Sequence, residues 1–99
     1  MNVEMIIVKA MEQALQQANP TLLDLVIFYL KNSVNADLKL AYKDPQKFKK
    51  LMSSLFGDYS TRLLELIVIK NIKENLGIIG DFQTLEELIE KLKVMAGEV

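Results

Sequence analysis

Apolar residues recur at helical spacing along most of the chain, with polar residues on the opposite side of each stripe. The clearest stripe follows Asp44 and Pro45, which favour the start of a helix as a cap and a first-turn residue. It predicts a helix over about 45–56 whose apolar side contains Phe48, Leu51, Met52, Leu55 and Phe56. Comparable stripes predict a helix over about 2–18 and another from Thr84 onward, where Thr84 and Glu87 have the spacing of a capping box.

The segment Leu22–Leu30 is apolar without a clear period, which suits a buried strand as well as a buried helix. A helix is favoured because Asn19 and Pro20 are a good cap and first-turn pair. No other segment offers a strand to pair with. The following residues, Lys31–Lys43, are expected to end this helix and form a connection.

The stretch Phe56–Gly77 predicts a central buried helix. Its middle, Leu63–Ile69, is apolar on nearly every side, and Gly77 is suited to a helix C-terminus. The predicted fold is therefore all-α, a compact bundle of about five helices around a central buried helix, in one domain over residues 1–99. An aspartate at Ile67 is expected to unfold it. The structural core is expected to contain Phe48, Leu55, Phe56, Gly57, Leu63 and Ile67.

Composition narrows the classes of function. The 99 residues are 51% hydrophobic and 25% charged, which fits one globular domain, and the net charge of −1 makes nucleic acid an unfavoured partner. The sequence has no cysteine and no histidine, so it lacks thiolate zinc sites and the Ser-His and Cys-His arrangements of nucleophilic catalysis. We therefore expect no enzyme, no catalytic residue, no cofactor and no metal site.

The N-terminal segment carries Glu4 and only a short apolar run, unlike a secretory signal. No apolar run approaches the length needed to cross a bilayer. A cytoplasmic protein without membrane contact is expected.

Two charged stretches have a functional and an ordinary interpretation. The basic stretch could form a phosphate-binding surface, but a solvated helix face is favoured because Asp44 interrupts it and no arginine or aromatic residue is interleaved. The acidic C-terminal helix could meet the basic stretch of a second copy, and a solvated face with supporting ion pairs is again favoured. The lysines concerned are Lys39, Lys43, Lys47, Lys49 and Lys50.

The helix, glycine turn and helix predicted over Met52–Leu66 resemble the layout of a DNA-binding helix-turn-helix. In that alternative, a small DNA-binding regulator would present Ser60, Thr61 and Arg62 to the groove. The apolar second helix leaves few polar positions to contact bases, so this alternative is not favoured.

The chain has more apolar surface than a monomer of this size buries easily. We therefore expect a homo-oligomer, most simply a homodimer, or a docked partner helix from another protein. The apolar faces of the first two helices supply the candidate interface residues Ile6, Val8, Val26 and Tyr29.

The order of Asp44-Pro45, Phe48, Leu55-Phe56-Gly57, Leu64-Glu65 and Leu76-Gly77 resembles the archaeal Nitrosopumilus output domain family over about residues 20–78. These are small helical domains found alone or attached to sensory and signalling modules. The resemblance implies an archaeal-type domain that transmits a signal by interaction and carries no catalytic residue. The sequence thus predicts a non-enzymatic protein-protein interaction module, acting as a stand-alone output-type domain.

Overall fold

The computed structural model describes residues 1–98; Val99, the last residue of the expected domain, lies outside them. The described residues are helical and contain no strand, which confirms the all-α class. The chain folds into a body of 34 × 23 × 20 Å. The helices are α1 (Val3–Ala18), α2 (Pro20–Val34), α3 (Leu40–Lys43), α4 (Pro45–Phe56), α5 (Asp58–Leu76) and α6 (Leu85–Met95).

The predicted helix starts are confirmed by side chains that accept hydrogen bonds from free backbone N–H groups. Asn19 accepts from Thr21 at 3.0 Å beside Pro20, and Asp44 accepts from Lys47 at 3.1 Å beside Pro45. The Thr84 hydroxyl accepts from the Glu87 N–H at 3.2 Å, as in the predicted capping box. The Glu87 carboxylate, however, lies 3.4 Å from the Thr84 hydroxyl and not on its backbone N–H.

The connection predicted over Lys31–Lys43 contains a sixth, one-turn helix, α3. The Asp37 carboxylate accepts a hydrogen bond from the Lys39 N–H at 2.9 Å and turns the chain. Leu38 and Ala41 are buried at 6% and 0% exposed. The core thus holds this segment in a helical turn that is too short to give a periodic signal.

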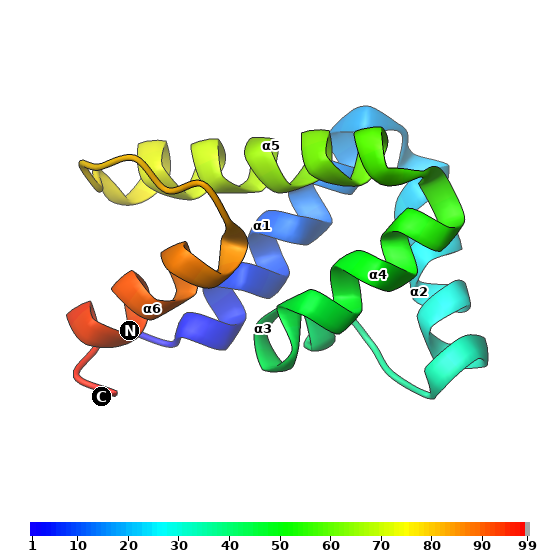
Figure 1. Cartoon of the computed structure of the whole chain (residues 1–99), viewed down its shortest axis with the longest axis horizontal. Coiled ribbons are helices and arrows are strands. Elements are labelled where there is room, and N and C mark those ends of the chain that lie inside the picture. Colours follow the sequence, from blue (N-terminus) through cyan, green and yellow to red (C-terminus); the bar gives the residue numbers. More distant parts are fainter. Residues whose placement is uncertain (99) are drawn as a thin grey trace.

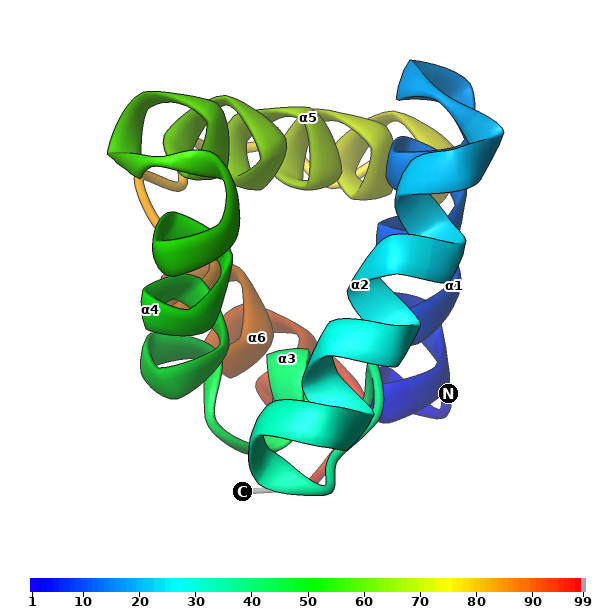
Figure 2. The ribbon, with the colours of Figure 1, turned by 90° about the vertical axis from the view of Figure 1, so that its right-hand side faces the viewer.

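The central helix is α1, not the predicted α5. Helix α1 contacts α2, α3, α5 and α6, whereas α5 contacts α1, α4 and α6. In both views α5 runs along the upper part of the molecule (Figures 1 and 2), and in Figure 2 α4 and α2 lie on opposite sides below it. Helices α4 and α5 meet at the corner expected from Gly57, which has a φ of 88° in the region that favours glycine.

Helix α5 is two-sided, which corrects the prediction that Leu63 and Ile67 lie in the core. They are 48% and 38% exposed, while Val68 and Ile72 on the opposite side are 0% and 2% exposed. The apolar run gave no contrast between the two sides, so the pattern could not indicate which one the other helices cover.

The remaining predicted core positions lie on α4 and at its end. Phe48 is buried at 1% exposed, and Leu55 and Phe56 are partly buried against the core. Gly57 is exposed at the turn between α4 and α5. Its place in the fold depends on its backbone conformation and not on burial.

We predict that aspartate substitutions one position apart on α5 will differ sharply in stability. Val68→Asp places an unpaired charge in the core and should lower the free energy of unfolding by about 4 kcal/mol. Ile67→Asp keeps access to water and should lower it by about 1 kcal/mol. Urea unfolding followed by circular dichroism measures both; equal losses would contradict the two-sided helix.

Candidate functional site

An apolar groove lies between the α1–α2 turn, the end of α4 and the outer side of α5. Its volume is about 230 Å³. Ser60 is the one lining residue with a polar side chain, and the partly exposed Leu63 and Ile67 form part of the wall. The lining residues are Ala14, Leu15, Ala18, Leu22, Phe56, Ser60, Leu63, Leu64 and Ile67.

The groove continues onto an exposed apolar strip, here called the α5 stripe, formed by Tyr59, Leu63, Leu66 and Ile67. Their exposed fractions are 82%, 48%, 42% and 38%. Leu63 follows Tyr59 by four positions, and Leu66 and Ile67 follow Leu63 by three and four, so the four side chains lie on one side of the helix, opposite the buried side of α5. Beyond the groove, α2 also exposes Leu25. The groove and stripe therefore form one apolar surface, to which α1, α2, α4 and α5 contribute.

The prediction that Val26 belongs to an interface on α1 and α2 is wrong, because Val26 is 0% exposed and packs in the core. Ile6, Val8 and Tyr29 are partly buried against the same core. Helix α2 buries Leu23, Val26 and Leu30, whereas neighbouring apolar positions such as Phe28 are exposed. The apolar pattern of the sequence predicted this helix, but it did not indicate which side of the helix packs against α1.

A buried carboxylate lies on the inner side of α5. Glu65 is 6% exposed, and its oxygens accept hydrogen bonds at 2.8 Å from Lys49 of α4, Arg62 of α5 and the backbone N–H of Leu85. Leu85 is the first residue of α6, so Glu65 satisfies a free donor at that helix start. Lys49 also forms an ion pair at 2.8 Å with Glu86.

The Arg62 guanidinium also donates to the backbone carbonyl of Gln83, just before α6. One carboxylate and its three donors therefore connect α4, α5 and the start of α6. The sequence offered one signal for this network, an acidic residue inside an otherwise apolar run with an arginine three positions earlier. The interpretation of this run as a core helix gives Glu65 no partner, because the spacing within one helix does not indicate contacts with Lys49 or Leu85.

The network shifts the pKa values of Glu65 and Lys49. Burial by itself raises the pKa of the Glu65 carboxyl, but hydrogen bonds from Lys49, Leu85 and Arg62 outweigh burial and hold the pKa below its ordinary value. Burial by itself lowers the pKa of Lys49, and the carboxylates of Glu65 and Glu86 reverse that effect and raise it. Both groups are therefore charged at neutral pH.

The three residues that the DNA-binding alternative would present to the groove have different surroundings. Thr61 is 5% exposed and donates its hydroxyl hydrogen to the Gly57 carbonyl at 2.8 Å. Arg62 is held by Glu65 and Gln83, and only Ser60 is free of such contacts while lining the apolar groove. Together they do not present a polar face to a nucleic acid.

The basic stretch is divided among different surroundings. Lys39 and Lys43 line a hollow of about 390 Å³ with Lys31, whereas Lys49 is paired with acidic residues in the network. Lys50 and Lys49 both line a separate hollow of about 750 Å³. Lys39 and Lys43 therefore lie in a different hollow from Lys49 and Lys50.

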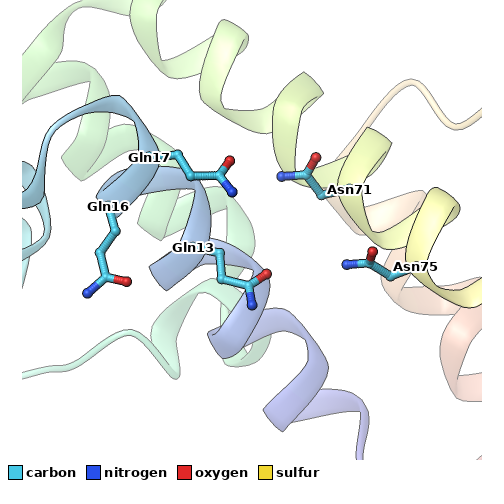
Figure 3. A pocket seen from close by; sticks show the side chains of 5 residues that line it. All are labelled: Gln13, Gln16, Gln17, Asn71 and Asn75. Carbon is cyan, nitrogen blue, oxygen red and sulfur yellow. The ribbon is translucent and has the colours of Figure 1, made fainter.

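A further hollow, of about 440 Å³, is lined only by side-chain amides. Gln13 and Gln17 of α1 and Asn71 and Asn75 of α5 point into the space between the two helices, whereas Gln16 points away from α5 (Figure 3). These groups are uncharged donors and acceptors. They can hydrogen-bond a ligand, but water satisfies them equally well.

Residues 1–98 contain neither a cluster of metal ligands nor a membrane-spanning helix. No three acidic side chains in this range lie close enough together to hold a metal ion. None of the helices formed by these residues is long and apolar enough to cross a membrane.

The fold and surface define a small all-helical domain with an apolar groove. The family profile of Nitrosopumilus output domain 5 matches residues 1–94, and the chain belongs to this family. The match extends the resemblance seen over residues 20–78 to α1 and most of α6.

A search of curated proteins found no match. Among solved structures, the chain is similar to the crystal structure of PH0832 from Pyrococcus horikoshii OT3, with 38% sequence identity and a TM-score of 0.89. The similarity covers 97% of this chain and 99% of that chain.

We predict that Glu65→Gln will lower the stability of the fold and will also make that stability depend less on pH in the acid range. The folded-state pKa of Glu65 lies below its unfolded value of about 4.3, so its contribution to stability is complete above that pH and is lost as the pH falls through the folded-state pKa. The variant should be about 2 kcal/mol less stable at pH 7. It should also lose less stability on acidification.

Urea unfolding over a pH series measures this effect. Glu90→Gln is the matched control, because Glu90 is 68% exposed and lies 3.9 Å from Lys93 in an i,i+3 pair. A Glu65→Gln curve that runs parallel to the wild-type curve down to acid pH would contradict the assignment.

Proposed function

We propose that this protein is a non-enzymatic interaction module of the cytoplasm, which transmits a signal by docking its apolar groove and the α5 stripe onto a protein partner. The observation that carries the proposal is the continuity of this surface across α1, α2, α4 and α5. Contiguous exposed apolar patches on small domains commonly mark sites of protein contact.

The gain from covering this surface comes from the release of water from apolar groups. The amide-lined hollow between α1 and α5 offers no comparable gain, because each hydrogen bond to a partner would replace one to water. The groove is therefore favoured over the amide-lined hollow as the docking site.

The buried side of α5 supports this role. Glu65, Lys49 and Arg62 hold α5 against α4 and the start of α6, so the outer side of the helix has a fixed position. A rigid surface loses little conformational entropy when a partner binds. The network thus acts on binding through the position of the stripe and not by contact with the partner.

We predict that a photo-cross-linking amino acid at Leu63 will form a discrete protein adduct in cells. Leu63 is 48% exposed on the stripe and lines the groove. The same amino acid at Val94, an apolar residue of α6 that is 60% exposed, should give none. Denaturing electrophoresis with an antibody to the chain measures the adducts.

Specific docking requires that a second substitution on the stripe, Leu66→Glu, abolish the adduct formed from position 63. An adduct that survives this change, or that forms equally from position 94, would count against the proposed surface.

A further inference from the structure

We propose that the partner on the α5 stripe is a second copy of this chain, with the two α5 helices packed antiparallel about a two-fold axis between Leu63 and Leu66. The proposal rests on the proposed function and names its partner. It also moves the self-association surface from the predicted faces of α1 and α2 to α5.

The spacing along the stripe fits a helix partner. Tyr59, Leu63, Leu66 and Lys70 are separated by four, three and four positions. This alternation keeps one seam facing a second helix over successive turns. The seam also lies on the side of α5 opposite the buried residues Val68 and Ile72, so it is open to a partner.

The charges at the C-terminal end of the seam favour one direction of pairing. Lys70 and Glu74 lie at the C-terminal end of the seam, exposed at 74% and 63%, and 4.0 Å apart. A parallel pair would place Lys70 against Lys70 and Glu74 against Glu74, which is repulsive. An antiparallel pair places Lys70 beside Tyr59 of the second copy and makes the contact attractive.

The chain already contains the chemistry of that contact. Lys93 lies over the ring of Tyr42 at 5.3 Å from its centroid, and Lys73 lies 6.0 Å from the centroid of Phe82. In the antiparallel pair, Tyr59, 82% exposed, gains a cation over its ring and loses its exposure to water.

The register follows from the same pairing. When Lys70 lies opposite Tyr59 of the second copy, Leu63 lies opposite Leu66 and the reverse contact is identical by symmetry. Such a self-complementary contact is the general form of a two-fold interface. Ile67, on the groove side of the seam, brings the groove to the edge of the interface and extends it toward Leu22.

The seam is short, so the association should be of moderate strength. Stable interfaces bury about 800 Å² on each partner, which is more than three helical turns supply alone. The native mass should therefore rise with concentration from that of the 11.3 kDa chain to twice that value.

Sedimentation equilibrium of the full chain tests the proposal. Leu63→Glu and Leu66→Glu should each weaken the association about tenfold or more. Val94→Glu places the same charge at an exposed apolar position of α6 and should leave it unchanged. Circular dichroism checks that each variant keeps the helical fold.

Direction and register are tested by cross-linking, because the chain has no cysteine of its own. Tyr59→Cys and Lys70→Cys chains are mixed and oxidised. The antiparallel pair predicts a disulfide between position 59 of one chain and position 70 of the other, in excess of either homodisulfide. Residues 59 of the two copies would lie about 16 Å apart along the axis, too far to bridge.

Three results would overturn the inference: a chain that stays monomeric over the concentration series, a dimer that Leu63→Glu does not weaken, or a dominant 59–59 disulfide. A monomer whose position 63 still forms a specific adduct with another protein would overturn the second copy as partner and leave the proposed function standing. A chain with neither adduct nor dimer would remove both.

Discussion

The buried carboxylate of Glu65 is the interaction on which the arrangement of the second half of the chain depends. Removing a carboxylate from water is costly unless donors replace the water, and here three donors come from three elements. Because Lys49 belongs to α4 and Leu85 begins α6, satisfying one side chain fixes both helices on α5. A shift of either helix would leave a buried charge unpaired.

The position of α5 in turn determines the character of the molecular surface. With its inner side held by the Glu65 network and by Val68 and Ile72 in the core, the helix leaves its other side to solvent. That side is also apolar, so the same apolar run supplies both a core and an exposed surface. The exposed side of an ordinary surface helix is polar. Because the exposed side of α5 is apolar, the α5 stripe is the proposed site of interaction.

The family match and the structural neighbour show that this fold is not peculiar to one sequence. The chain and PH0832 from Pyrococcus horikoshii OT3 share 38% identity and superpose over nearly the full length of both. The matched family covers residues 1–94, which includes the groove, the stripe and the Glu65 network. Fold and family are thus established, and the interaction role is proposed from the surface itself.

The sequence by itself determined the helical class, most helix boundaries and the corner at Gly57. Those features depend on local physics: a cap such as Asp44, a proline in the first turn, or a glycine that adopts a positive φ acts on its own neighbours. The periodic side of α4 likewise indicated that Phe48 would be covered.

Only the tertiary structure decided which side of each apolar helix is covered. Leu63 and Ile67 were expected in the core and Val26 at an interface, and the structure reverses both, because an all-round apolar helix carries no local record of where its neighbours pack. The same holds for Glu65, whose partners lie sixteen positions before and twenty positions after it in the chain. Contacts made across such separations depend on the packing of whole helices, which local spacing does not specify.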